Sequence, residues 1–249
     1  MNNQSIYNNY YTKGCLSGMV GIIISHPVDS IKTHIQTNST QHINYSLKNL
    51  YRGIMSPLIG VGLEKALVFG TYNYCINSNY INNNYINSNY KIPISGAISG
   101  LVASLIVSPY ERIKIMHQTS QPINIKSLQL FKGMGTTFTR EVPGFAIYFS
   151  TYEMLKNKFY KDKNITIPAS FLFGGMSGTM AWIFIYPQDR IKTIIQSNTG
   201  NINIVELIKN TYRVGGLKQF YKGFLFAVAR AILLHSGTFC MMEILNKEL

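Results

Sequence analysis

Long apolar segments alternate with short polar ones along the chain, and the apolar segments dominate the pattern. The runs at 92–110 and 164–188 contain no charged residue, and 14–28 is a shorter run of the same kind. A helix that crosses a bilayer needs roughly 20 mostly apolar residues, so these segments are typical of membrane-spanning helices.

Three further apolar segments are each interrupted once near the middle, at Glu64 and Lys65, at Arg140 and Glu141, and at Arg230. Together with the uncharged runs they predict six helices, at about 11–37, 54–76, 92–118, 134–158, 168–197 and 223–246. The stretch "NSNYINNNYINSNYK" at 77–91 consists almost entirely of Asn, Tyr and Ser, and we expect a solvated loop there.

One motif, Pro-x-acid-x-x-Lys-x-x-x-Gln, occurs three times, with its prolines 82 and 78 residues apart. Glycines recur 13 and 9 residues before each proline, and an aromatic-basic-glycine triplet follows each copy. Shared features in register indicate an internal repeat. The prolines are Pro27, Pro109 and Pro187, and the repeats are predicted at 11–76, 92–158 and 168–247, with the loop 77–91 between the first two.

The residue types of the motif have a physical reason to recur. A proline inside a helix frees a carbonyl one turn earlier and kinks the helix. Small residues four apart let neighbouring helices approach closely. The acid and the lysine could pair within their own helix. If the three kinked helices converge, they could instead pair around a ring, as Asp29 with Lys114, Glu111 with Lys192, and Asp189 with Lys32, braced by Gln36, Gln118 and Gln196.

The motifs "HPVDSIKTHIQ", "SPYERIKIMHQ" and "YPQDRIKTIIQ" resemble those of the mitochondrial carrier family, over nearly the whole chain. The resemblance implies an all-α membrane protein with six transmembrane helices from three repeats, arranged with threefold pseudo-symmetry around a central cavity. It also implies a multi-pass protein of the inner mitochondrial membrane that exchanges metabolites by alternating access.

Further expectations follow from the family. The ring of charges would be the matrix gate. The basic-glycine pairs would lie near bound cardiolipin, whose anionic headgroups suit helix N-termini and cations; they are Arg52 and Gly53, Lys132 and Gly133, and Lys222 and Gly223. We expect a monomer with structural cardiolipin, and no cofactor, metal or nucleic-acid partner.

The chain also departs from the family pattern. Lys32 to Tyr51 spans 19 residues and Lys114 to Phe131 spans 17, against 29 in the third repeat, so we expect shortened matrix helices in the first two repeats. The cytoplasmic gate motif, aromatic-acid-x-x-basic, is complete in only one repeat. In the family's pairing, the charged residues Glu153, Lys156 and Glu243 would face Asn246, Asn73 and Ile76, which predicts a weak cytoplasmic gate.

The mid-membrane level carries the candidate binding site. Aligning Phe69, Phe149 and Phe239 with offsets of 80 and 170 puts Gly60, Arg140 and Arg230 at one level, with Val61 and Glu141 beside them. In the family this level selects the substrate. A charge at the bilayer centre is costly unless it faces a partner or a wet cavity. Arg140 and Glu141 could form an internal salt bridge, but adjacent helical residues point about 100° apart, which favours roles toward a ligand.

Each charge has a matching ligand group. Arg140 and Arg230 can hold a carboxylate through bidentate hydrogen bonds, and Glu141 can hold a cation. Glu64 could be a second acid or the partner of Lys65. Trp182 could hold a cation against its ring or simply pack. The stretch "REVPGF" resembles the branch that carries basic amino acids, ornithine, carnitine and acylcarnitine, so we expect a substrate of that kind.

Other functions remain open at this stage. The net charge of +13 suits nucleic acid or an anionic membrane, and the interleaved apolar segments favour the membrane. A carrier for a keto acid, a nucleotide or an S-adenosylmethionine-like molecule is an alternative, as is a carrier-derived scaffold that no longer transports. An enzyme is not expected, because no metal or nucleophile constellation accompanies the charges.

Overall fold

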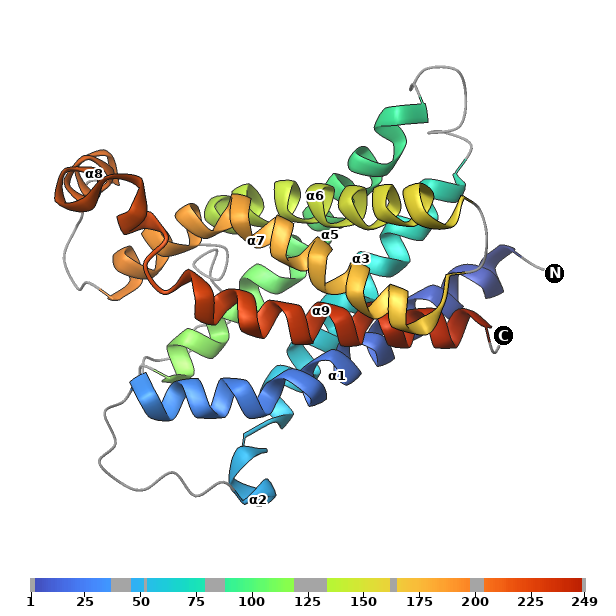
Figure 1. The fold of residues 1–249 in the computed structure, drawn as a ribbon, viewed down its shortest axis with the longest axis horizontal. Helices are drawn as coiled ribbons and strands as arrows, with labels where there is room; N and C mark the ends of the chain where they lie inside the picture. Colours follow the sequence, from blue (N-terminus) through green and yellow to red (C-terminus); the bar gives the residue numbers. More distant parts are fainter. Residues whose placement is uncertain are drawn as a thin grey trace.

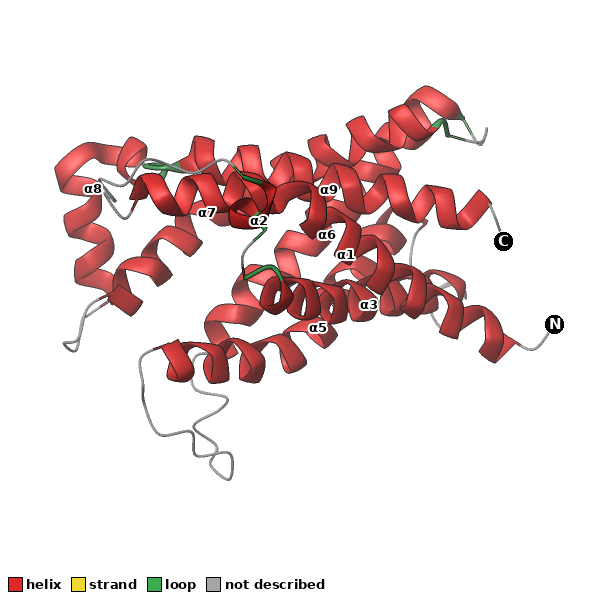
Figure 2. Cartoon of the chain, turned by 90° about the horizontal axis from the view of Figure 1, so that it is seen from below, coloured by secondary structure: helices red, strands yellow, loops and turns green. Residues whose placement is uncertain are grey.

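The structure is a computed structural model that describes residues 3–36, 46–51, 53–78, 88–118, 134–161, 165–197 and 204–247. Within these ranges every regular element is an α-helix (Figures 1 and 2). The six long helices are α1 (Asn3–Gln36), α3 (Met55–Asn77), α5 (Ser88–Gln118), α6 (Met134–Tyr160), α7 (Ile167–Ser197) and α9 (Phe224–Lys247). Two shorter helices are α2 (Leu47–Leu50) and α8 (Ile204–Phe220).

The six long helices are those that the apolar pattern predicts. Their ends agree with the predicted ends to within about four residues, except that α1 begins at Asn3, well before the predicted residue 11. The predicted loop at 77–91 is too long, because helix α5 already begins at Ser88. Residues 79–87 of that loop lie outside the described residues.

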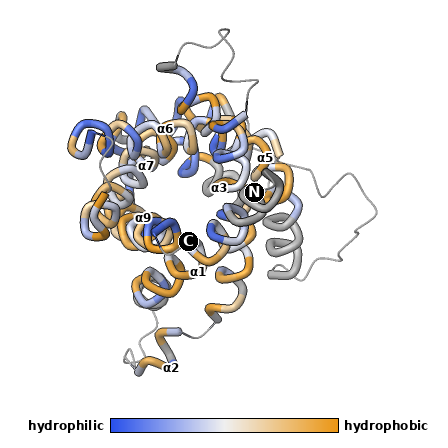
Figure 3. The backbone as a smooth tube through the Cα atoms, turned by 90° about the vertical axis from the view of Figure 1, so that its right-hand side faces the viewer, coloured by the Kyte–Doolittle hydropathy of each residue, from blue (hydrophilic) through white to orange (hydrophobic). Residues whose placement is uncertain are grey.

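The long helices form a closed ring. Helices α1 and α3, α5 and α6, and α7 and α9 pack as pairs, and α3 with α5, α6 with α7, and α9 with α1 close the circle. Figure 3 views this ring end on. Both chain termini lie at one end of the ring, and α8 lies at the other (Figure 1).

Glycines set how closely the paired helices approach. A Cβ on Gly14 would lie 2.5 Å from the carbonyl oxygen of Lys65, and one on Gly100 would lie 2.5 Å from that of Glu141. Gly174 meets the backbone of α9 in the same way, at 2.7 Å. Any side chain at these positions would push the helices apart, so the prediction of close approach at the recurrent glycines is confirmed.

The outer surface of the ring is apolar. Large apolar side chains point outward on several helices; Leu101 is 46% and Phe184 is 61% exposed. By length and composition, three described helical segments could cross a membrane: Tyr90–Pro109, Ile167–Ile191 and Ala227–Lys247. Helices α1, α3 and α6 also carry charged residues within their lengths, among them Glu64 and Lys65 of α3 and Arg140 and Glu141 of α6.

Two tyrosines complete the hydrogen bonding where the motif prolines interrupt a helix. The Tyr51 hydroxyl donates to the carbonyl of Ile23 at 3.1 Å, and the Tyr221 hydroxyl donates to that of Ile183 at 2.9 Å. Each carbonyl lies four residues before the motif proline, whose missing N–H would otherwise have bonded it. The aromatic residue of the triplet therefore supplies the hydrogen bond that the proline removes in the first and third repeats.

The glycines of the triplets have a conformational role. Gly53 has φ +80° and Gly223 has φ +87°, a left-handed conformation that favours glycine, and each lies directly before a long helix. The helix preceding Gly53 is only the four-residue α2, whereas the one preceding Gly223 is the 17-residue α8. The predicted shortening is therefore confirmed for the first repeat; the corresponding segment of the second, at 119–133, lies outside the described residues.

Candidate functional site

A cavity of about 740 Å³ occupies the centre of the ring, between α3, α6, α7 and α9. Its wall is polar where α3, α6 and α9, the second long helix of each repeat, carry their central charges. All seven residues that the sequence predicts for substrate binding line it: Gly60, Val61, Glu64, Arg140, Glu141, Trp182 and Arg230. The geometry brings these residues to one space, and their contact with a substrate stays a prediction.

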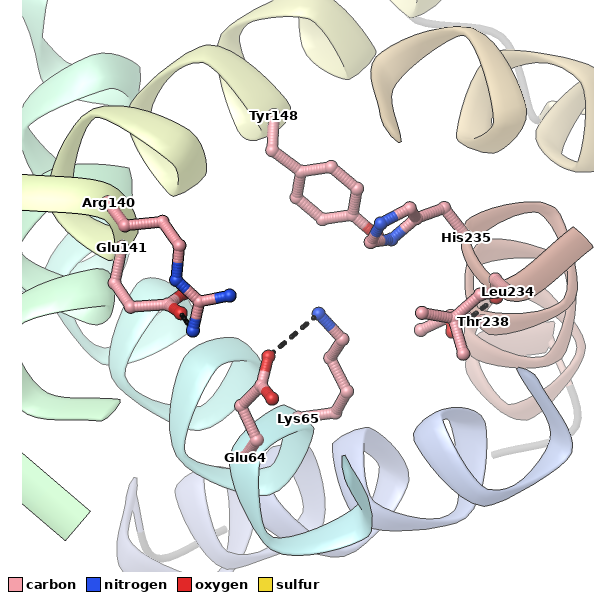
Figure 4. A network of polar contacts seen from close by, with 8 residues as sticks. All are labelled: Glu64, Lys65, Arg140, Glu141, Tyr148, Leu234, His235 and Thr238. Atoms are coloured by element: carbon pink, nitrogen blue, oxygen red, sulfur yellow. Dashed lines mark hydrogen bonds and ion pairs between the residues drawn. The ribbon is translucent and has the colours of Figure 1, made fainter. Parts of the chain in front are cut away.

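Arg140 and Glu141 pair with each other (Figure 4). A second carboxylate, that of Asp189 on α7, lies 4.0 Å from the Arg140 guanidinium. The expectation that adjacent helical residues are poorly placed to pair is wrong here. Both side chains are long enough to bend toward the cavity and meet there, although their Cα–Cβ bonds diverge.

A second adjacent pair lies across the cavity. The Lys65 ammonium lies 3.3 Å from the Glu64 carboxylate (Figure 4), which settles the partner of Glu64 in this structure. The Lys65 side chain is only 2% exposed. Its Nζ atom lies 4.7 Å from the ring centroid of Phe145 and 5.5 Å from that of Tyr148, within the range of cation–π attraction.

His235 and Tyr148 also line the cavity, with Tyr148 next to the Lys65 ammonium. A hydrogen bond of 3.2 Å joins His235 Nδ1 to the Tyr148 hydroxyl, and the ring centroids are 4.8 Å apart. The sequence analysis missed Lys65, Phe145 and His235 as wall residues. The signal was present, because the offsets of 80 and 170 that align α3, α6 and α9 relate these three positions to one another.

Past Tyr148 and His235, stacked aromatic rings fill the space between α3, α6 and α9 and close this end of the cavity. The Phe69 ring meets those of Phe149 and Phe239 edge on, with centroids 5.4 and 5.7 Å apart, which confirms the register used in the alignment. Tyr72 stacks on Phe149 at 3.7 Å, and Tyr152 stacks on Phe239 at 3.6 Å. Aromatic packing closes this end, so the closure does not depend on the ion pairs that the sequence lacks.

The predicted cytoplasmic gate residues belong to the same end of the helices: Glu153, Lys156 and Glu243. The Glu243 carboxylate lies 4.0 Å from the Lys247 ammonium of its own helix. Asn246, the predicted neighbour of Glu153, accepts a 3.1 Å hydrogen bond from Lys13 of α1. At these positions the structure has an ion pair within one helix and a hydrogen bond from an ammonium to an amide, where the family pattern would place ion pairs between helices.

The opposite end of the cavity is charged. Asp189, Arg190 and Lys222 line it, together with Gly223. Of the predicted matrix-gate residues, Asp189 has a described side chain. The other eight have helical backbones, and their side chains lie outside the described part of the structure: Asp29, Lys32, Gln36, Glu111, Lys114, Gln118, Lys192 and Gln196. Arg52, Lys132 and Gly133, predicted near cardiolipin, also lie outside the described residues.

Within the described ranges, no group of three or more His, Cys, Asp or Glu side chains is placed to hold a metal ion. The charges of the cavity wall are instead arranged as paired cations and carboxylates, which suits noncovalent binding of a charged or zwitterionic molecule.

Comparison with known proteins supports the same reading of the fold. The family model described as mitochondrial carrier protein matches residues 4–82, 125–163 and 163–249. A mitochondrial basic amino acids transporter of Bos taurus is 26% identical over 273 residues, which cover 94% of this chain and 90% of the relative. A mitochondrial carnitine carrier of Saccharomyces cerevisiae is 29% identical over 278 residues, covering 94% and 85%.

A third relative, the mitochondrial substrate carrier family protein S of Dictyostelium discoideum, is 28% identical over 272 residues, covering 95% of each chain. The relatives are thus matched over nearly their full length, and the family model covers most of the chain. A closed ring of long helices with an apolar exterior and a charged central cavity suits a membrane transporter of small molecules. The chain belongs to the mitochondrial carrier family and is a metabolite transporter of the inner mitochondrial membrane.

Proposed function

We propose that this carrier exchanges a molecule bearing both a carboxylate and a cationic group, such as a basic amino acid or a carnitine-like compound. The carrying observation is the central cavity of about 740 Å³, whose wall combines cations with acids: Lys65, Arg140, Arg190, Lys222 and Arg230 with Glu64, Glu141 and Asp189. A dicarboxylate or a nucleotide would favour a wall with more cations and fewer acids.

Each charged wall residue would bind a substrate group of opposite charge. A guanidinium holds a carboxylate through two parallel hydrogen bonds, which suits Arg140 and Arg230. A cationic group of the substrate would pair with the Glu141 carboxylate. Arg140, which pairs with Glu141 in this structure, could then turn and bind the substrate carboxylate. Trp182 lines the same wall and offers an aromatic face to a cation. Relatives named for basic amino acids and for carnitine support this substrate class.

The proposed architecture has six membrane-crossing helices, α1, α3, α5, α6, α7 and α9, in three repeats with threefold pseudo-symmetry. The aromatic end would face the cytoplasm and the charged end the matrix, so that the cavity described above would be closed toward the cytoplasm. Alternating access would open the aromatic end and close the charged end through the matrix-gate ring. The carrier would act as a monomer with cardiolipin at the basic-glycine pairs.

The test is transport by the purified protein in liposomes. Labelled ornithine, lysine, arginine, carnitine, acylcarnitines, ADP and malate would be offered to liposomes preloaded with the same compound, with protein-free liposomes as the control. We expect exchange of at least one compound that carries both charges. Uptake of ADP or malate without any cation-bearing compound would refute the proposal, and folded protein without any uptake would favour the scaffold.

A further inference from the structure

Lys65 is a charged side chain in a place where charge is costly. It is 2% exposed, lies near the middle of α3 (Met55–Asn77), and ranks among the largest fully buried side chains described. A charge in such a position is tolerated only with partners, and in membrane proteins it usually marks a functional site.

The surroundings of its ammonium form a cage. One side is the Glu64 carboxylate at 3.3 Å, and two others are the faces of Phe145 at 4.7 Å and Tyr148 at 5.5 Å. A carboxylate together with aromatic faces is the chemistry with which proteins recognise organic ammonium ions. The cage faces the central cavity, because all four residues line it; Figure 4 shows three of them, Glu64, Lys65 and Tyr148.

The backbone that carries Lys65 is held in place. Cβ atoms on Gly14 and Gly18 of α1 would lie 2.5 Å from the Lys65 carbonyl oxygen and 2.8 Å from its Cβ, so α1 packs directly against this turn of α3. The helix therefore has little freedom to move at this point. The four-carbon stem is the flexible part, and the ammonium can leave the cage only by a change of side-chain rotamer.

We propose that Glu64, Phe145 and Tyr148 form an ammonium-binding subsite that the chain's own Lys65 occupies in the absence of substrate. One cationic group of the substrate competes with Lys65 for this subsite, and Glu141 remains the acid for the second ammonium group of a basic amino acid. The inference rests on the proposed function, because it requires a substrate that carries a cation. It assigns to Lys65 a role in specificity that is distinct from direct binding by the arginines.

The exchange favours zwitterions over simple cations. When a substrate ammonium takes the cage, the displaced Lys65 ammonium stays in the cavity and needs an anionic partner. A substrate carboxylate supplies one, whereas a diamine leaves a further uncompensated cation in a cavity that already contains Arg140 and Arg230. Lys65 thus disfavours molecules that have the amine without the carboxylate.

The subsite can be tested without transport, by refilling it. The variant Lys65→Ala leaves a hole shaped for an alkylammonium. Propylammonium should raise the unfolding temperature of purified Lys65→Ala saturably, by about 2–4 °C, and leave the wild type unchanged. Propan-1-ol, similar in shape but neutral, should have no such effect. Adding Glu64→Gln to Lys65→Ala should abolish the response. An equal rise with propan-1-ol, or no saturable rise with propylammonium, would overturn the subsite.

The competition is tested in liposomes with Lys65→Met, which keeps the volume without the charge and covers the case in which Lys65→Ala does not fold. Cadaverine, which has the two amines of lysine and no carboxylate, should inhibit transport about tenfold more strongly in Lys65→Met than in the wild type, and Lys65→Arg should resemble the wild type. Unchanged inhibition by cadaverine would overturn the competition. If the wild type transports no cation-bearing compound, the proposed function fails, and the propylammonium assay still decides the subsite.

Discussion

The two ends of the central cavity differ in chemistry. Aromatic rings close one end, and charged side chains line the other. At one end, rings from three helices pack edge on and face to face, with Phe149 only 1% exposed. At the other, Asp189, Arg190 and Lys222 line a polar opening. One end therefore excludes water by aromatic packing, and the other attracts ions.

The difference shows how one end of such a cavity can be closed without ion pairs between helices. Ion pairs near water are weak and screened by salt, whereas aromatic stacking is insensitive to ionic strength. At the closed end, where the family pattern would place charged residues, the Asn73 side chain accepts a hydrogen bond from the Asn77 amide, and the Asn246 side chain accepts one from the Lys13 ammonium. The weak cytoplasmic gate stays a prediction; it rests on charged residues alone and does not include these stacked rings.

The largest effect is expected from breaking the closed end. Phe149→Ala removes a buried ring that stacks on Tyr72 at 3.7 Å, and should lower the free energy of unfolding by about 3–5 kcal/mol. Thermal unfolding in detergent, followed by fluorescence of the single tryptophan, Trp182, would measure it. The matched control is Phe184→Ala, because Phe184 is 61% exposed on the outer face and its loss should stay within about 0.5 kcal/mol. Similar losses in both variants would contradict the assignment.

The next effect is expected in the charged wall. Arg140→Ala and Glu141→Ala should each lower transport at least about 30-fold, since each loses a charged contact worth about 2 kcal/mol or more. Because the two side chains pair with each other, the double variant Arg140→Ala with Glu141→Ala separates the explanations. A purely structural pair would give a double variant with restored transport, and a binding role gives one that stays inactive. Initial rates in liposomes, corrected for folded protein, decide this.

A smaller effect is expected at the proline positions near the charged end. Tyr221→Phe removes the hydroxyl that bonds the Ile183 carbonyl at 2.9 Å, and should lower the free energy of unfolding by about 1 kcal/mol. Tyr212→Phe on α8 is the control, because Tyr212 is 58% exposed and should tolerate the change. If Tyr212→Phe lowered the free energy of unfolding as much as Tyr221→Phe, the loss could not be assigned to the hydrogen bond of the Tyr221 hydroxyl.

The smallest effect concerns restoring a charge to the closed end. Asn73→Asp should strengthen closure on the aromatic side by up to about 1 kcal/mol and favour the state open at the charged end, slowing exchange up to about fivefold. The comparison is Asn157→Asp, which adds the same charge at an exposed position of α6 and should leave exchange unchanged. Normal exchange in Asn73→Asp would show that charges no longer contribute to this gate.

The helices and their register could be predicted because they follow from patterns in one dimension. Apolar runs locate the helices, and one pair of offsets brings Phe69, Phe149 and Phe239 together as the structure has them. Hydropathy failed at the start of α1, because residues 3–10 are polar and yet contain no proline or glycine to stop the helix.

The residues that line the site could be predicted from the sequence, but the ion pairs among them could not. Which residues share a helix level follows from sequence spacing, so Arg140, Glu141 and Arg230 could be assigned to one level. How long side chains turn depends on neighbours from other helices. The cage around Lys65 needs Phe145 and Tyr148 of α6, so its contacts could not be derived from α3 alone.

The hydroxyl that replaces the proline's hydrogen bond has a mechanical consequence. A helix bonded through its own backbone bends only by breaking its ladder, whereas a bond from a side chain can break and reform while the helix stays intact. The first and third motif helices can therefore bend at their prolines by breaking one side-chain hydrogen bond, that of Tyr51 or Tyr221. The second repeat has Phe131 at this place of the triplet, which carries no hydroxyl, so this fastening is missing from its chemistry. The first and third repeats therefore share a hydrogen bond that the residue type at the same place of the second repeat cannot donate.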